Sequence, residues 1–196
     1  WAAGEYFSKD AGPVSVWVEE RTVRASRGGT GTAKCGGNYA ASLTAQMEGK
    51  EHGCHQVLFL DAQERRWLEE MGGMNVMMVF EDGTLQTPPL DSGTILHGIT
   101  RDSLLTLARD RGLKVKEERY AIDQLYGDAD SGKLKEVFAC GTAAVVTPIG
   151  TFKSTEGGCT IGNGQTGEVT SSLRKALCDI QFGRAADPHG WVKKIG

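Results

Sequence analysis

The segment from Met71 to Phe80 limits the possible folds of this chain more than any other part of the sequence, because it is mostly apolar and short. A short apolar run between turn residues predicts a buried strand. Asp82-Gly83 follows, a dipeptide that favours a tight hairpin turn, and residues 84–87 then read as a second strand. The sequence therefore predicts a sheet that contains this hairpin.

The other segments mix strands and helices without regular alternation. Helical patterns run from about residue 38 to 51, from 101 to 111 and from 168 to 181. Further strand patterns cover residues 14–18, 21–25, 56–60, 66–68, 114–119, 136–140 and 144–149. No internal repeat or low-complexity linker divides the chain. Mixed elements of this kind indicate the α+β class.

Composition excludes several classes of protein. The 196 residues suffice for one domain with a real core. Lys and Arg total 22 against 25 Asp and Glu, which gives no basic stripe for nucleic acid or an anionic membrane. No apolar run approaches the roughly 20 residues of a membrane span, and the start Trp1 to Gly4 does not look like a signal peptide. The five cysteines are scattered and odd in number, which favours reduced thiols and a soluble, cytoplasmic protein.

Two short motifs suggest binding sites but are better explained as turns. His52-Gly53-Cys54-His55 offers metal ligands without a second half at suitable spacing, so we expect a loop at a helix end and no metal site. Residues 162–167 spell G-x-G-x-x-G, but the βαβ unit and the ribose-binding acid of a dinucleotide site do not follow. We expect a turn that precedes the last helix.

Lys34 is the strongest candidate for chemistry, because small residues and glycines surround it from Gly28 to Gly37. Glycines remove side-chain bulk and let the backbone approach a ligand closely. Such a lysine either clamps a nucleotide phosphate or forms a Schiff base with a carbonyl such as that of pyridoxal phosphate. A surface lysine in a glycine-rich loop is the default for an isolated match.

The nucleotide interpretation fails at two positions of the P-loop motif G-x-x-x-x-G-K-[ST]. Ala33 stands at the second glycine, and Cys35 stands where a hydroxyl should bind magnesium. A thiol is a poor ligand for that oxygen-seeking ion. P-loop nucleotide binding is therefore not expected.

Five segments, in order along the chain, resemble the branched-chain amino acid aminotransferases, which are fold-type IV pyridoxal phosphate enzymes. They are K-C-G-G-N-Y-A from Lys34, E-M-G-G-M-N from Glu70, G-T-I-L-H-G-I-T-R from Gly93, F-A-C-G-T-A-A from Phe138, and residues 180–183 with 189–191. The resemblance covers essentially the whole chain. Several ordered segments are more specific than one motif.

The resemblance implies the large domain of a fold-type IV aminotransferase, a pseudo-barrel of mixed strands with surrounding helices. Residues 1–196 correspond to the C-terminal, cofactor-binding domain, and the family's N-terminal small domain is expected outside this chain. The implied activity is ping-pong transamination of branched-chain L-amino acids with 2-oxoglutarate by a cytoplasmic homodimer. D-amino acid transamination, aminodeoxychorismate lysis and a non-catalytic fragment stay open as alternatives.

The resemblance also assigns roles to residues. Lys34 holds the cofactor and moves the proton, and Glu70 pairs with the protonated ring nitrogen. The phosphate is assigned to the main-chain N–H groups of Ile99 and Thr100 at a helix start, to Thr142 and to Arg24, with Tyr39 beside the cofactor. Gly141, Thr142 and Ala143 border the substrate.

Two positions depart from the family pattern. His97 replaces the proline usual in the phosphate turn, and Gly73 stands where some members have a threonine that assists substrate binding. The cysteine pair that mammalian members carry after the matched threonine is absent, since Ala144 and Thr147 occupy those positions. No redox switch of that kind is expected here.

Overall fold

The computed structural model describes residues 12–193 and residue 195, so the expectation for Trp1 to Gly4 lies outside the described residues. The strands are β1 (Val14–Glu19), β2 (Gln56–Leu60), β3 (Leu68–Met71), β4 (Met74–Phe80), β5 (Thr84–Thr87), β6 (Lys114–Glu117), β7 (Leu134–Gly141), β8 (Val145–Ser154) and β9 (Gly157–Thr160). The helices are α1 (Gly36–Glu51), α2 (Ile99–Asp110), α3 (Ile122–Asp130) and α4 (Glu168–Gln181).

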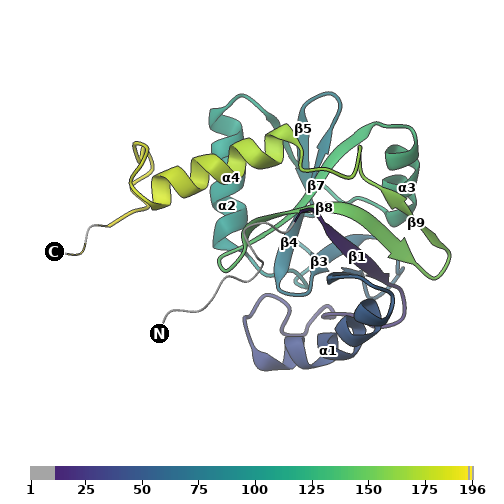
Figure 1. Cartoon of the computed structure of the whole chain (residues 1–196). Coiled ribbons are helices and arrows are strands. Elements are labelled where there is room, and N and C mark those ends of the chain that lie inside the picture. Colours follow the sequence, from purple (N-terminus) through teal and green to yellow (C-terminus); the bar gives the residue numbers. More distant parts are fainter. Residues whose placement is uncertain (1–11, 194, 196) are drawn as a thin grey trace.

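The described strands form one mixed sheet that closes into a barrel (Figure 1). Six strands make the ring in the order β3-β2-β1-β8-β7-β4, and β4 pairs back with β3. β1 is parallel to both β2 and β8, and the other pairs of the ring are antiparallel. β5 and β6 extend the sheet from β4, and β9 pairs with β8. The predicted α+β pseudo-barrel is confirmed.

Burial on both faces of β4 explains why its sequence is apolar from Val76 to Phe80. Val76, Met78 and Phe80 belong to the cluster that also contains Leu58 and Leu60 of β2. The intervening Met77 and Val79 pack instead with apolar residues of α2 and α4. Since successive side chains of a strand point to opposite faces, both faces of β4 are covered and both must be apolar.

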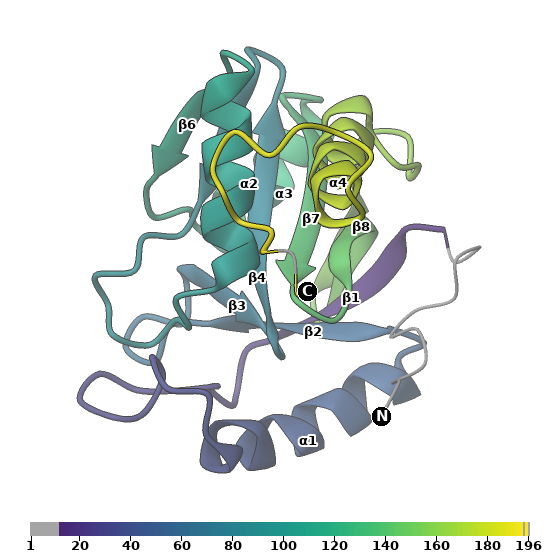
Figure 2. The same cartoon turned by 90° about the vertical axis from the view of Figure 1, so that its left-hand side faces the viewer.

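α1, α2 and α4 cover the outside of the barrel (Figure 2), whereas α3 adds Ile122 and Leu125 to the cluster that contains Val76 and Met78. α1 packs on β1 and β2 through Trp17, Ala45 and Val57. α2 and α4 lie against each other and contribute Leu104, Leu173 and other residues to the second cluster. None of the described helices is long and apolar enough to cross a membrane.

Most predicted elements are present, with helix 168–181 matching α4 in full. The turn at 162–167 is also confirmed, because Gly167 is the N-cap of α4 and the Gln165 N–H bonds to the Asn163 side chain. His52 ends α1, as expected of a helix-end loop.

The strand expected at residues 21–25 is wrong. The Glu19 carboxylate accepts hydrogen bonds from the N–H groups of Arg21 and Thr22, so the chain turns immediately after β1. The strand expected at 66–68 begins later, at Leu68, because Asp61 binds four backbone N–H groups between Gln63 and Trp67 and holds them in a turn. Neither α3 nor β9 was predicted.

Candidate active site

Glu70 is a buried residue of β3, close to the turn that joins β3 to β4. It pairs with Asn75 across the two strands, and its side chain is 1% exposed. Its Oε2 accepts a hydrogen bond from the backbone N–H of Leu96 at 2.9 Å and lies 3.3 Å from Nη1 of Arg24. The residue predicted to face a ring nitrogen is therefore a buried carboxyl with a cation and a backbone donor on one oxygen.

Burial dominates the electrostatics of this carboxyl. It raises the pKa of Glu70 from 4.5 to about 7, although the Arg24 guanidinium and the Leu96 N–H both act to lower it. Burial also raises the pKa of neighbouring Glu69, whose Oε1 accepts a hydrogen bond from the Thr94 hydroxyl. Strongly shifted carboxyls of this kind concentrate at functional sites.

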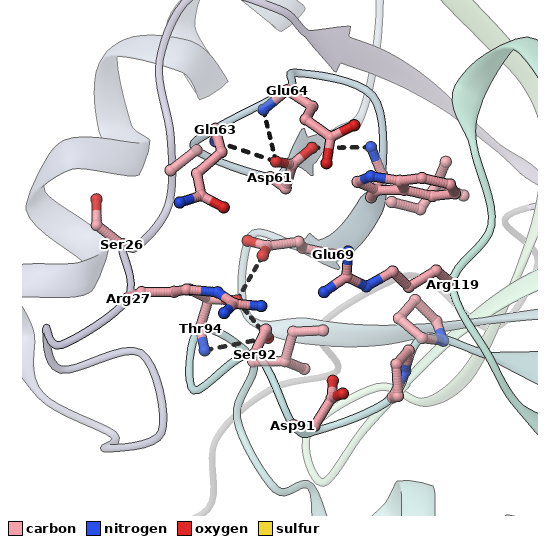
Figure 3. A pocket seen from close by; sticks show the side chains of 16 residues that line it. Ser26, Arg27, Asp61, Gln63, Glu64, Glu69, Asp91, Ser92, Thr94 and Arg119 are labelled. Carbon is pink, nitrogen blue, oxygen red and sulfur yellow. Dashed lines mark hydrogen bonds between the residues drawn. The ribbon is translucent and has the colours of Figure 1, made fainter.

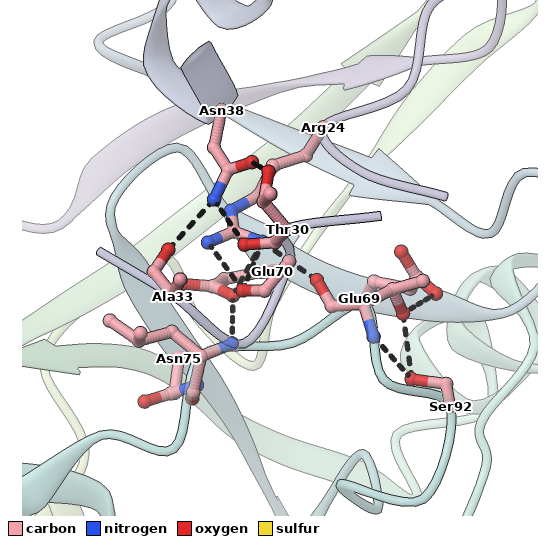
Figure 4. A network of polar contacts seen from close by, with 11 residues as sticks. Arg24, Thr30, Ala33, Asn38, Glu69, Glu70, Asn75 and Ser92 are labelled. Atoms are coloured by element: carbon pink, nitrogen blue, oxygen red, sulfur yellow. Dashed lines mark hydrogen bonds and ion pairs between the residues drawn. The ribbon is translucent and has the colours of Figure 1, made fainter. Parts of the chain in front are cut away.

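Arg24 connects Glu70 to two other segments (Figure 4). Its guanidinium donates to the carbonyl of Thr94 at 2.7 Å and to the carbonyl of Gly31 at 3.4 Å. These groups and Glu70 are its polar partners within the described part of the chain. The expected contact between Arg24 and the cofactor phosphate stays a prediction, whereas the observed position is beside Glu70.

Lys34 lies exposed in the loop that leads into α1. Asn38, in the first turn of α1, bonds to this loop at three points: it accepts from the Thr30 hydroxyl at 2.7 Å and donates to the carbonyls of Thr30 and Ala33, each at 2.8 Å. Gly31 packs so closely on the segment around Thr94 that a Cβ on Gly31 would lie 2.5 Å from Cα of Thr94. The backbone next to Lys34 is thus held from two sides.

Tyr39 and two turns lie together near the start of β4. A Cβ on Gly73 would be 3.7 Å from Cε1 of Tyr39, and a Cβ on Gly141 would be 3.6 Å from the carbonyl oxygen of Gly73. Thr142 and Ala143 follow Gly141 and are exposed in the turn between β7 and β8. The structure therefore brings Tyr39 and the predicted substrate-binding segment to one place.

The N-terminus of α2 supplies free backbone donors. Its first intrahelical hydrogen bond runs from the Asp102 N–H to the Gly98 carbonyl, so the preceding N–H groups, those of Ile99 and Thr100 among them, have no helical partner. Ile99 is 75% exposed. Asn75 donates to the Leu96 carbonyl at 3.0 Å and so fixes the turn before the helix. This geometry suits an anion.

A separate cavity of about 210 Å³ lies on the Glu69 side of this region (Figure 3). Arg27, Glu69 and Arg119 border it, together with Trp67 and Thr94. Its lining includes none of the residues predicted to bind the cofactor or substrate. We therefore distinguish it from the candidate active site. Within the described residues, no group of His, Cys, Asp and Glu side chains is arranged to hold a metal ion.

A comparison with protein-family models decides the family. The model for "Amino-transferase class IV" matches residues 5–152. The chain belongs to the class IV aminotransferases. This family assignment agrees with the resemblance seen in the sequence.

Curated relatives of this aminotransferase are named for branched-chain amino acids. A probable branched-chain-amino-acid aminotransferase of Streptomyces coelicolor is 56% identical over 193 residues, which cover 98% of this chain and 53% of the relative. The branched-chain-amino-acid aminotransferase of Mycobacterium tuberculosis H37Rv is 54% identical over 197 residues, covering 99% of this chain and 53% of the relative. The chain thus spans about half the length of the curated relatives that it matches.

Solved structures of the same family share the fold. The branched-chain amino acid aminotransferase of Escherichia coli has a TM-score of 0.82 and 32% identity, with 99% of this chain and 60% of that chain covered. The branched-chain aminotransferase of Thermoproteus uzoniensis, solved with norvaline, has a TM-score of 0.76 and 29% identity, with 92% and 55% covered. A further branched-chain aminotransferase, solved with pyridoxamine 5'-phosphate, has a TM-score of 0.82 and 32% identity, with 98% and 59% covered. The class IV aminotransferase fold is therefore confirmed.

Sequence reasoning missed two polar residues of the site, Asn38 and Asn75. Both lie within the segments that carried the resemblance, but neither was given a role. Their partners are the backbone carbonyls of Thr30, Ala33 and Leu96, and for Asn38 also the Thr30 hydroxyl. A side chain that bonds to a carbonyl leaves no signal in the partner's residue type, which is why the sequence concealed them.

Proposed function

We propose that this chain is the cofactor-binding part of a longer branched-chain aminotransferase, which transfers the amino group of leucine, isoleucine or valine to 2-oxoglutarate. The observation that carries the proposal is the combination of an exposed lysine, Lys34, on a doubly anchored loop with a buried carboxyl, Glu70, joined to that loop through Arg24. The names of the relatives supply the substrate class.

The described residues fit pyridoxal 5'-phosphate. The cofactor, when bound, provides an electron sink that stabilises negative charge at the substrate Cα. Glu70 offers a carboxylate for a protonated ring nitrogen, the N–H groups of Ile99 and Thr100 offer donors for a phosphate, and the exposed Thr142 hydroxyl can add another. Tyr39 would lie beside the ring.

Lys34 performs the acid–base step in this proposal. Its side chain extends from a loop that places no bulky neighbour beside it, since Ala33, Cys35 and Gly36 are all small. Its Nζ removes the proton from Cα of the amino acid and later returns one to the reacting centre, as a general base and then a general acid. Gly141 and Ala143 leave room for the substrate.

The test compares Lys34→Ala with Lys50→Ala in the full-length protein. Lys50 is an exposed lysine near the end of α1 and serves as the matched control. We expect Lys34→Ala to lose transamination and covalent retention of the cofactor after borohydride, and Lys50→Ala to keep both. Retention of more than a few per cent of the activity by Lys34→Ala would refute the assignment.

The same assay tests the substrate class. L-leucine with 2-oxoglutarate is compared with D-alanine and with aminodeoxychorismate, so that a preference for either of the last two identifies the other activities considered for this fold.

The proposal includes an N-terminal small domain, a homodimer and a cytoplasmic location. Five free cysteines in the described part of the chain are compatible with a reducing compartment.

A further inference from the structure

We propose that Asn38 is a positioning residue for Lys34, and that its side-chain amide sets where the lysine amine stands relative to Glu70. This inference rests on the proposed function of Lys34. Asn38 is not among the residues predicted to bind the cofactor or the substrate. Hydrogen bonds around the loop from Thr30 to Ala33 support this role (Figure 4).

The amide of Asn38 makes three hydrogen bonds, all of them to Thr30 or Ala33. Nδ2 donates to the carbonyls of Thr30 and Ala33, and Oδ1 accepts from the Thr30 hydroxyl. A carbonyl can only accept, so the two carbonyls determine which end of the amide faces them. Asparagine is the side chain of this length that offers two donors and an acceptor on one rigid plane.

The contact is partly buried and close to the lysine. Asn38 is 5% exposed, whereas Thr30 and Ala33, whose carbonyls it binds, are exposed residues, so the amide ties an exposed loop to a buried point of α1. Ala33 directly precedes Lys34, and its own N–H donates to the Thr30 carbonyl at 2.9 Å. The amide therefore closes a small backbone turn that ends at Ala33, directly before Lys34, whose Nζ is the reactive amine.

The other side of the same turn is joined to Glu70. Gly31 accepts hydrogen bonds from Arg24, which also contacts Glu70 and the Thr94 carbonyl. A Cβ on Gly31 would lie 2.5 Å from the Thr94 carbonyl oxygen, so this part of the turn cannot move away without a gap. With Gly31 held on the Glu70 side, Asn38 determines the direction in which the chain leaves towards Lys34.

Two substitutions at Asn38 and two at Thr30 test the proposal in the full-length protein. Asn38→Asp keeps the shape and the acceptor but turns the donors into an acceptor that faces two carbonyls. Asn38→Leu removes all polar atoms at similar volume. Thr30→Val removes the hydroxyl that donates to Oδ1 of Asn38, and Thr30→Ser keeps that hydroxyl.

Thr170→Val is the matched structural control. Thr170 lies in the first turn of α4, and its buried hydroxyl donates a hydrogen bond to the carboxylate of Glu136 in β7. The substitution therefore also removes a hydrogen bond at a helix start. It lies outside the candidate site. This control separates a loss of stability, read from Tm, from a loss of lysine placement.

The first measurement is the rate at which borohydride fixes pyridoxal phosphate to Lys34 at saturating cofactor, followed by the mass of the Lys34 peptide. The second is the separation of kcat from KM, and the third is hydrogen exchange of the Ala33 N–H in the cofactor-free protein. We expect both Asn38 variants to lower the fixation rate and kcat by about tenfold or more, which corresponds to about 1.4 kcal/mol, with KM changed less than about threefold. Exchange at Ala33 should become faster.

A fixation rate in Asn38→Asp within twofold of the unchanged protein overturns the proposal, as does an equal loss in Thr170→Val at the same Tm. A fixation rate that falls in Thr30→Val and is kept in Thr30→Ser supports it. If the unchanged protein itself shows no fixation on Lys34, the proposed function fails and this inference fails with it. If the unchanged protein shows fixation and the Asn38 variants show the same rate, only the inference is refuted.

Discussion

Glu70→Gln should remove a specific pH dependence of stability. The folded protein holds the Glu70 proton to about pH 7, whereas the unfolded chain releases it near 4.5. The folded state therefore binds more protons between these values, and the free energy of unfolding falls as the pH rises through this window. The full difference amounts to about 3 kcal/mol, of which roughly 2.5 kcal/mol lies between pH 5 and pH 8.

The assay is thermal unfolding of the cofactor-free, full-length protein at pH 5 and pH 8, at one protein concentration because association shifts Tm. Relative to Glu70→Gln, the unchanged protein should lose about 5 °C more in Tm over this interval. Other titrating groups, Glu69 among them, contribute to both proteins and largely cancel in the difference. Glu64→Gln, at an exposed position, is the control and should behave like the unchanged protein.

Equal pH dependence in the two proteins would refute the conclusion that burial dominates at Glu70. A change of the opposite sign would mean that the Arg24 ion pair at 3.3 Å outweighs desolvation and keeps the carboxylate charged. The measurement thus decides between two opposing causes whose directions are both known from the structure.

Two glycines give further predictions. Gly31→Ala should lower the free energy of unfolding by about 1–3 kcal/mol, because its Cβ would meet backbone atoms of Thr94 at 2.5 Å. Chemical denaturation measures this change. Gly36→Ala is the control and should be neutral or slightly stabilising, because a Cβ on Gly36 would have nothing within 4 Å. Gly98→Ala should weaken binding of pyridoxal phosphate by about tenfold, since its Cβ would overlap Oδ1 of Asn75 and displace the start of α2. Titration of the cofactor-free protein measures this affinity, and unchanged affinity would contradict the assigned phosphate position.

Local sequence was sufficient where an element has a strong pattern. Residues 74–80 and 168–181 were assigned correctly because apolar periodicity and flanking turn residues agree there. α3 was missed because it is a nine-residue helix that contains Gly127 and three aspartates, which are poor helix formers. β9 was missed because two of its four residues are glycine, so its place in the sheet depends on pairing with β8.

The sequence by itself determined that the chain is a class IV aminotransferase, since Lys34, Glu70 and the segments around them can be recognised from their residue types and their order along the chain. Only the tertiary structure decided that Arg24 pairs with Glu70 and that Asn38 bonds to the loop before Lys34. The physical reason is that an ion pair and a shifted pKa depend on distance and burial. Both arise when segments such as residues 24 and 70, far apart in sequence, are brought together by closure of the barrel.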